Sequence, residues 1–396
     1  MSLAANCCET GVSNASTWQP RPMREVTRDP VAAGGVSCRG GPRDGSRRPV
    51  GTRGAARSAA RLRAAALVTA LGVALPAGVG LSSAHAMPSR GHDVHRVVNV
   101  VDNFADVGFM KSRDRYYQYA TGAGFRMSSS TRPASGYSTP TSTMPNLPTW
   151  FGPRKDGRQH LWAPHVFRIP AQPDGTRFVM YFTGSRAGGN DCIGVAGAGS
   201  ASGPFLDRGT PIRCASDANL IDPSMYRAPD GKRYLVYKRT SVSDHKTEIR
   251  AIRTGTSGTY LAEGATSRRI AFGGARIIEA PEIVNHGGRV WLFVSRGKYT
   301  GCRYFTQVWK ARSIKETFEP AGGTSSRPGH FDISRRTGAN FCGPGGAELI
   351  DDGGTWRIAF HAWQHGTAST GGTRTAWTGR VRWSSTSGLP SMVRLP

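Results

Sequence analysis

Residues 221–237 read IDPSMYRAPDGKRYLVY, and this stretch decides the fold. An Asp-Pro turn leads into a short strand, Asp230-Gly231 forms a tight turn, and Tyr234-Leu235-Val236-Tyr237 supplies a second, aromatic strand. Asp-Gly between two apolar runs is typical of a two-stranded antiparallel hairpin. We therefore predict a β-hairpin here, with strands of about five residues each.

The same pattern recurs four more times along the chain. Each copy has a turn with proline or a substitute for it, an apolar strand, a polar turn and an aromatic-rich strand. The other copies begin with Ala105-Asp106-Val107, Ala163-Pro164-His165, Ala280-Pro281-Glu282 and Gly343-Pro344-Gly345. The proline or its substitute recurs after 57, 59, 58 and 63 positions, at Val107, Pro164, Pro223, Pro281 and Pro344. A third strand of small residues follows several hairpins, so one unit is a small antiparallel sheet of three or four strands.

Five such sheets in succession predict an all-β fold, a five-bladed β-propeller. A single small sheet leaves its faces exposed, and radial packing of neighbouring sheets buries them. The rival interpretation is a two-sheet sandwich whose hairpins resemble one another by chance. The 51 Gly and 25 Pro agree with a turn-rich β protein, and the 20 % of charged residues argues against a charge-rich disordered chain or a coiled coil. We expect the propeller to occupy residues 87–396.

Residues 1–86 are expected to form an N-terminal extension that ends in a secretory signal peptide. Three arginines, the last of them Arg63, precede an apolar run from Ala64 to about Leu81, and Ala84-His85-Ala86 is a small-residue cleavage site. No comparable apolar run recurs, so a membrane anchor is the weaker interpretation. We expect a secreted, extracellular protein whose mature chain begins near Met87.

The cysteines agree with export. Cys192, Cys214, Cys302 and Cys342 remain after the signal segment, an even number for an oxidising compartment. Four cysteines allow three pairings. We favour pairing Cys192 with Cys214 and Cys302 with Cys342, because the two cysteines of each pair lie in the same repeat or in adjacent repeats. A zinc site is disfavoured, since no Cys-x-x-Cys spacing exists.

The chain is strongly basic, with 52 Lys and Arg against 26 Asp and Glu, which gives a formal net charge of +26. Such a surface suits a polyanionic neighbour: nucleic acid, an anionic envelope or an acidic polysaccharide. The sequence has no zinc finger, no aromatic RNA-binding signature and no helix-turn-helix pattern. We therefore expect neither nucleic acid nor membrane as a partner.

Three carboxylates fall at matching places in the repeats. Asp106 and Asp222 occupy the same position in the first and third copies, and Glu279 lies one residue earlier in the fourth. Taken singly, an Asp before Pro is more often a turn residue. In a propeller, however, equivalent residues of the innermost strands converge on one channel. Converging carboxylates raise the pKa of at least one member, and glycosidic hydrolysis uses such a pair of acids.

At this point the sequence resembles glycoside hydrolase family 43, from about Val98 to Trp363. The resemblance rests on Asn103-Phe104-Ala105-Asp106, Trp162-Ala163-Pro164, Ile221-Asp222-Pro223-Ser224, Glu279-Ala280-Pro281 and His361-Ala362-Trp363. It implies an inverting mechanism with Asp106 as general base, Glu279 as general acid, and Asp222 orienting that acid and raising its pKa. Inversion implies acid and base carboxyls about 6.5–9.5 Å apart.

The resemblance also implies a substrate class. The strand Cys192–Ala196, the segment Ser202–Phe205 and the Gly343–Gly346 turn are similar to a branch that acts on α-L-arabinofuranosides and includes exo-acting enzymes on arabinan. We expect release of L-arabinose from arabinan or arabinoxylan by a monomer. An endo-arabinanase or a β-xylosidase would share the machinery. A non-catalytic carbohydrate-binding propeller is the alternative of another class.

Departures from the family pattern affect the remaining site residues. His165 stands where many relatives carry Asp, and we predict substrate contact for it and for His361, with a purely structural role equally open. Trp162 and Trp363 are predicted to stack on a sugar ring, with packing between blades as the alternative for both. Gly346 stands where many relatives have a His that holds a channel metal, so we expect no metal and no cofactor. Glu282 is the less favoured alternative to Glu279.

Overall fold

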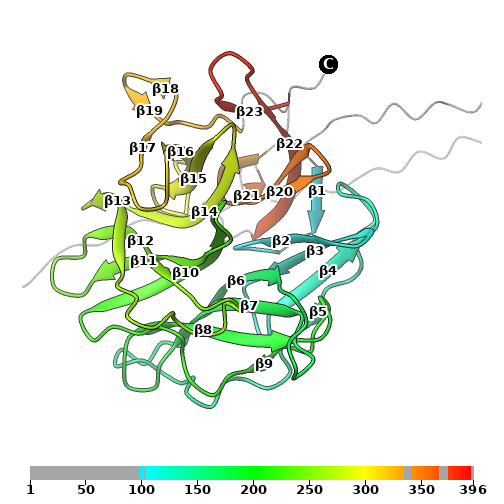
Figure 1. Cartoon of the computed structure of the whole chain (residues 1–396), viewed down its shortest axis with the longest axis vertical. Helices are drawn as coiled ribbons and strands as arrows, with labels where there is room; N and C mark the ends of the chain where they lie inside the picture. The colour runs from blue at the N-terminus through cyan, green and yellow to red at the C-terminus, as the bar shows by residue number, and fades with distance from the viewer. Residues whose placement is uncertain (1–97, 102, 334–340, 365–372, 394–396) are drawn as a thin grey trace, which may run out of the picture. The chain divides into compact units, whose positions relative to one another are not determined.

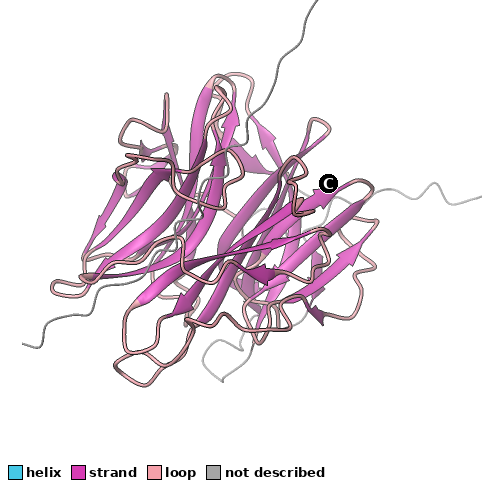
Figure 2. Cartoon of the chain, turned by 60° about the horizontal axis from the view of Figure 1, so that its bottom comes forward, coloured by secondary structure: helices cyan, strands magenta, loops and turns pink. Residues whose placement is uncertain are grey.

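The computed structural model describes residues 98–101, 103–333, 341–364 and 373–393, all within the unit His85–Pro396. Figure 2 shows this part of the chain as strands and loops. None of the described residues belongs to a helix long and apolar enough to cross a membrane. The predicted extension and signal peptide, residues 1–86, lie outside the described residues.

The unit is a five-bladed β-propeller, as predicted (Figure 1). Four of its blades are antiparallel sheets of four strands that follow one another in sequence, beginning with the innermost strand. Blade 1 contains β2 (Gly108–Ser112), β3 (Arg115–Ala120), β4 (Arg126–Ser130) and β5 (Thr141–Ser142). Blade 2 contains β6 (Leu161–Arg168), β7 (Phe178–Ser185), β8 (Asp191–Ala198) and β9 (Leu206–Asp207). Blade 3 contains β10 (Ala218–Arg227), β11 (Arg233–Ser241), β12 (Thr247–Arg253) and β13 (Arg268–Gly274). Blade 4 contains β14 (Ile278–His286), β15 (Arg289–Arg296), β16 (Phe305–Ala311) and β17 (Glu319–Pro320).

Blade 5 joins the two ends of the propeller sequence. Its strands are β20 (Phe341–Asp352), β21 (Thr355–Gln364), β22 (Arg374–Trp383) and, at the outer edge, β1 (Val98–Val101). The short β23 (Pro390–Met392) pairs with the other half of β22, and β18 (Gly323–Thr324) with β19 (Arg327–Pro328) forms a separate hairpin. The pairing of β1 with β22 closes the ring, because it bonds the first strand to the last blade.

Every blade carries the same backbone distortion where its innermost strand begins. One residue has a positive φ there: Asp106 (52°), Ala163 (49°), Asp222 (53°), Ala280 (48°) and Gly346 (60°). The strand pairing shifts by one residue at the last four of these positions, which marks a β-bulge. For the four residues other than glycine this backbone costs roughly 1–3 kcal/mol each, so the surrounding structure must enforce it. All five of these residues line one pocket, described below.

These positions correct the repeat alignment in the fifth copy. Gly345 pairs with His361 and Glu348 with Ala359, which matches the pairing of Glu279 with Ser295 and Glu282 with Phe293. The residue equivalent to Pro281 is therefore Ala347, and the predicted Pro344 lies three residues too early. Gly343 and Pro344 belong to an insertion at the start of β20 that the other copies lack. Pro344 was therefore mistaken for the proline of the repeat.

The core consists of five apolar clusters, one between each pair of neighbouring blades. Phe182 and Tyr119 belong to the cluster between blades 1 and 2, and Val101 and Phe109 to the one between blades 5 and 1. The other three lie between blades 2 and 3, 3 and 4, and 4 and 5. Both faces of every sheet are thus covered, which is the physical reason for radial packing.

Two disulfides are present, with the predicted pairing. Cys192 bonds to Cys214 and Cys302 bonds to Cys342. The second connects the loop between β15 and β16 to the start of β20.

Candidate active site

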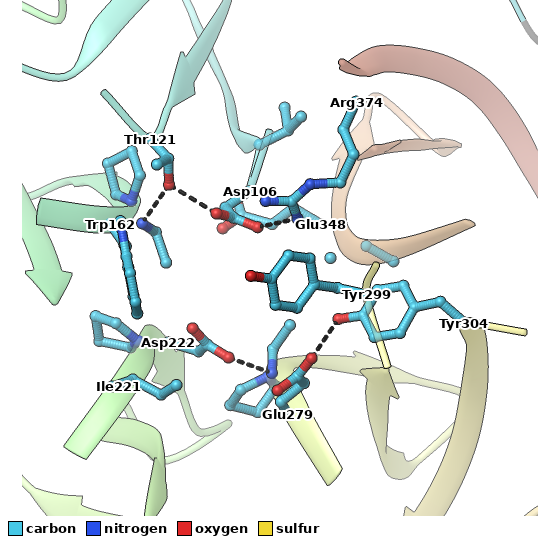
Figure 3. Close-up of a pocket in the computed structure, with 18 residues that line it drawn as sticks. Asp106, Thr121, Trp162, Ile221, Asp222, Glu279, Tyr299, Tyr304, Glu348 and Arg374 are labelled. Atoms are coloured by element: carbon cyan, nitrogen blue, oxygen red, sulfur yellow. Dashed lines mark hydrogen bonds and ion pairs between the residues drawn. The ribbon is translucent and has the colours of Figure 1, made fainter. Parts of the chain in front are cut away.

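A pocket of about 200 Å³ lies at the channel end where the innermost strands begin (Figure 3). Four of the predicted residues line it: Asp106, Trp162, Asp222 and Glu279. The propeller thus brings together carboxylates from blades 1, 3 and 4. Residues that the sequence did not single out also line the pocket, and they include Thr121, Tyr299, Tyr304, Glu348 and Arg374.

Asp106 stands on one side of the pocket with cationic and hydroxyl partners. Arg374 donates a hydrogen bond of 2.8 Å to its Oδ1, and Thr121 donates one of 2.7 Å to its Oδ2. Burial opposes ionisation of this carboxyl, but the Arg374 charge and the hydrogen bonds from Arg374 and the Thr121 hydroxyl hold the pKa of Asp106 below its usual value. Asp106 is therefore an ionised carboxylate, able to accept a proton.

Glu279 and Asp222 lie together on the opposite side (Figure 3). Glu279 accepts hydrogen bonds from Lys238 Nζ at 2.6 Å and from the Tyr304 hydroxyl at 2.9 Å. Asp222 accepts one from the main-chain nitrogen of Ala280 at 3.0 Å. Burial, reinforced by the neighbouring Glu279 charge, raises the pKa of Asp222 to about 7. The two carboxyls together therefore hold a proton near neutral pH, while Asp106 does not.

Trp162 forms the wall of the pocket between these two groups (Figure 3). Its ring stacks on His160 with the ring centroids 3.6 Å apart. His160 in turn contacts buried Asp191 through Nδ1 at 2.9 Å, and Arg154 bonds the other oxygen of Asp191 at 2.6 Å. This buried network fixes the indole plane, and an aromatic plane of this kind can bind the apolar face of a sugar.

Tyr299 stands across the pocket from Trp162 (Figure 3). Its side chain is 49 % exposed, and the guanidinium of Arg374 lies 4.8 Å from its ring centroid. Trp363 donates its indole N–H to the main-chain oxygen of Tyr299 at 2.8 Å. Trp363 therefore supports the Tyr299 loop.

The two histidines predicted to contact substrate do not line the pocket. His361 is 1 % exposed and lies behind Asp106, whose main-chain nitrogen donates to His361 Nδ1. His165 is also buried, and its Nδ1 lies 2.8 Å from Glu348 Oε1. Their predicted substrate contacts stay predictions.

The residues present do not fit the histidine-held channel metal that the resemblance implies. Gly346 offers no side-chain ligand, and a Cβ built there would lie 2.9 Å from the ring of His361. The next layer of the channel instead brings together His165, Glu282 and Glu348, whose ligand atoms lie within 4.8 Å of one another. Both oxygens of Glu348 already have partners, His165 and the nitrogen of Phe109. His165 and Glu282 both directly follow the proline of their repeat. Glu348 holds the equivalent place in the fifth copy, and it was missed because that copy was aligned three residues too early.

Arg374, Tyr304 and Lys238 donate hydrogen bonds to the predicted carboxylates, and sequence reasoning missed all three of these partners. Arg374 is the first residue of β22 and Tyr304 directly precedes β16, and neither position belongs to the repeat pattern used for the prediction. Lys238 did carry a signal, since it directly follows the repeated aromatic strand Tyr234–Tyr237.

An ionised carboxylate that faces a carboxyl pair holding a proton is the arrangement that glycosidases use. The chain belongs to glycosyl hydrolases family 43, because the sequence model of that family matches residues 99–388. It is therefore an enzyme that acts on O-glycosidic bonds.

Individual relatives agree with this membership. The chain is 25 % identical over 272 residues to a probable arabinan endo-1,5-α-L-arabinosidase C of Neosartorya fischeri, covering 66 % of this chain and 74 % of that one. The corresponding protein of Aspergillus flavus is 25 % identical over 301 residues, covering 70 % and 88 %. Among solved structures, an exo-1,5-α-L-arabinanase from a bovine ruminal metagenomic library has a similar fold, with a TM-score of 0.58, 22 % identity and coverage of 76 % and 99 %.

Proposed function

We propose that the protein is a secreted, inverting glycoside hydrolase that releases L-arabinose from α-L-arabinofuranosides and arabinan. One observation carries the proposal: an ionised Asp106 faces the Asp222 and Glu279 pair, which holds a proton, across a single pocket. Oppositely poised carboxyl groups are what acid and base catalysis of glycoside hydrolysis requires.

The proposed reaction is a single displacement. Asp106 accepts a proton from water, and the water oxygen attacks the anomeric carbon. The glycosidic bond breaks as Glu279 gives its proton to the leaving oxygen, so the anomeric configuration inverts. Asp222 is bonded to the nitrogen of Ala280, next to Glu279 in the chain, and this contact supports a role in orienting the acid.

The relatives support arabinan as the substrate, because those of Neosartorya fischeri and Aspergillus flavus are named for activity on it. The small pocket supports exo action. Its volume of about 200 Å³ lies below the range of roughly 300–1,000 Å³ for sites that hold drug-sized ligands. Endo action is the second candidate, since the names of those two relatives specify it.

Secretion is supported by the signal-like segment before Met87 and by the two disulfides, which persist in oxidising compartments.

The test is product analysis on linear arabinan. Exo action releases only monomer, whereas endo action yields a series of oligomers. Proton NMR recorded during the reaction identifies the first-formed anomer, which is β for an inverting enzyme on α-linkages. Binding without any product, with p-nitrophenyl α-L-arabinofuranoside and the matching β-xyloside also intact, would refute hydrolysis and favour a carbohydrate-binding propeller. Cleavage of the xyloside alone would instead indicate a β-xylosidase.

A further inference from the structure

In each blade one residue, within the second strand or directly after it, faces the start of the innermost strand of the neighbouring blade. In blades 2, 3, 4 and 5 it is the cross-strand partner of the residue just before the bulge: Thr183, Lys238, Ser295 and His361. Thr121 holds the same place in blade 1, where its nitrogen bonds the oxygen of Ala105. These five positions form a ring around the pocket.

Four members of this ring do the same structural task. Each accepts a hydrogen bond from the main-chain nitrogen of the bulge residue in the next blade. The bonds are Ala163 to Thr121 at 3.0 Å, Asp222 to Thr183 at 3.0 Å, Gly346 to Ser295 at 2.8 Å and Asp106 to His361 at 2.9 Å. A strained bulge with its N–H satisfied in this way is held in place from the neighbouring blade.

Lys238 is the exception in the ring. An ammonium group has three donors and no acceptor, so it cannot bond the nitrogen of Ala280 in blade 4. Asp222 takes over that task through its Oδ2, at 3.0 Å. Lys238 instead donates to Glu279 Oε2 at 2.6 Å.

A lysine at this position destabilises the fold, which points to a function for its charge. Lys238 is 7 % exposed and Glu279 is 8 % exposed, and taking the ammonium charge out of water at this buried place carries a large desolvation penalty. A threonine, as in blades 1 and 2, would satisfy Ala280 without that penalty. The ion pair therefore serves the carboxyl and not the bulge.

We propose that Lys238 is a positioning residue of the acid: its ammonium holds Glu279 in place and stabilises the negative charge left when this carboxyl gives up its proton. This inference rests on the proposed function. When the O–H bond of Glu279 breaks, its proton and the electron pair of the glycosidic bond go to the leaving oxygen. The new carboxylate then remains beside Lys238.

The charge of Lys238 also opposes the groups that keep a proton on the acid pair. Asp222, Tyr304 and Glu348 face this region, and Asp106 and Arg374 lie across the pocket. Burial and the Glu279 charge raise the pKa of Asp222, whereas Lys238 lowers it. Without Lys238 the acid pair would bind its proton more tightly and release it less readily.

Lys238→Met tests this inference because it keeps an unbranched side chain only one atom shorter and removes the charge. We expect the alkaline limb of the pH dependence of kcat/KM to move up by about 1–3 pH units, the usual effect of one nearby charge. We also expect kcat on arabino-oligosaccharides to fall about 10-fold or more, with little loss on p-nitrophenyl α-L-arabinofuranoside, whose leaving group needs less protonation. Lys238→Arg keeps the charge and should retain the wild-type pH profile.

A direct titration separates this inference from the proposed function. Carbon NMR of labelled Asp and Glu carboxyls follows the acid pair without any substrate, in the wild type and in Lys238→Met. An upward shift of its titration in the variant supports the inference even if arabinosides prove not to be the substrate. Lys238→Thr restores the hydroxyl of the other blades, and it serves as the folded comparison should Lys238→Met be unstable. An unchanged carboxyl titration in either charge-removing variant would overturn the inference.

Discussion

The main-chain nitrogen of Asp106 donates a 2.9 Å hydrogen bond to Nδ1 of His361. The accepting nitrogen carries no proton, so the imidazole is neutral. Burial and the nearby Arg374 charge lower the pKa of His361 to about 3, against a weaker opposing effect of Asp106. This hydrogen bond holds the main chain of Asp106, the proposed base, in its positive-φ conformation. Without the bond, the strained backbone could relax to another conformation.

Replacing His361 with Asn should make stability less sensitive to acid. Because the folded-state pKa lies below the unfolded value of 6.5, the unfolded chain binds the proton first, and the wild type loses stability as pH falls below about 6.5 at up to about 1.4 kcal/mol per pH unit. An Asn oxygen can accept the Asp106 N–H but does not titrate. Urea unfolding at about pH 7 and about pH 5 should give a loss roughly 2 kcal/mol smaller in the variant. Parallel losses in the two proteins would contradict a neutral buried His361.

The acid and the base should respond differently to the leaving group. The Glu279→Gln variant has no carboxyl proton to donate, so its kcat on arabinan should fall by about 100-fold or more. Its kcat on p-nitrophenyl α-L-arabinofuranoside should fall less, because that leaving group needs less protonation. Asp106→Asn cannot activate water and should be inactive on both substrates. Steady-state kinetics on the two substrates checks this pattern. Wild-type turnover by either variant would show that its assigned role is wrong.

The pKa shifts predict a bell-shaped dependence of kcat/KM on pH. Asp106 must be ionised, and its lowered pKa places the acid limb below the usual range of a carboxyl. The acid pair must keep its proton, and the pKa of about 7 at Asp222 places the alkaline limb near neutral pH. Activity should therefore be highest in mildly acidic solution. An alkaline limb at about pH 9 or above would argue that another group supplies the proton.

The propeller could be predicted from sequence because its signal is local. The turn and strand pattern of each hairpin is complete within about 20 residues. The nearly constant spacing of the hairpins can be measured without knowing which residues are in contact. The carboxylates Asp106, Asp222 and Glu279 followed from the period, since symmetry brings equivalent residues together. The spacing failed at Gly343–Gly346, where three extra residues with their own proline imitated the repeat.

The partners that set the chemistry were not predictable in the same way. Arg374 reaches Asp106 across 268 positions, and it does so because β1 closes blade 5 beside it. Tyr304 reaches Glu279 from a loop whose course depends on a disulfide. Lys238 could have been found by aligning the residues that follow the second strands of the repeats. Its role could not, because it depends on the hydrogen bond from the Ala280 nitrogen to Asp222, which connects two blades.

The two disulfides offer a matched comparison between stability and activity. Their cysteines are 22 and 40 positions apart, and chain entropy assigns both a stabilisation of about 3–4 kcal/mol. Cys302–Cys342 anchors the loop that carries Tyr299 and Tyr304, both of which line the pocket. Cys192–Cys214 belongs to a different part of the surface, near Lys155 and Arg186. Replacing either pair with serine should therefore lower the melting temperature to a similar degree.

Only the loss of Cys302–Cys342 should also change substrate binding. Once that loop is released, Tyr299 and Tyr304 spend less time in their positions, and KM should rise several-fold. The serine variant of Cys192 and Cys214 should keep the wild-type KM at a temperature where both variants are folded. Equal KM values in the two variants would mean that β15, β16 and the Trp363 contact hold the tyrosines without help from the disulfide.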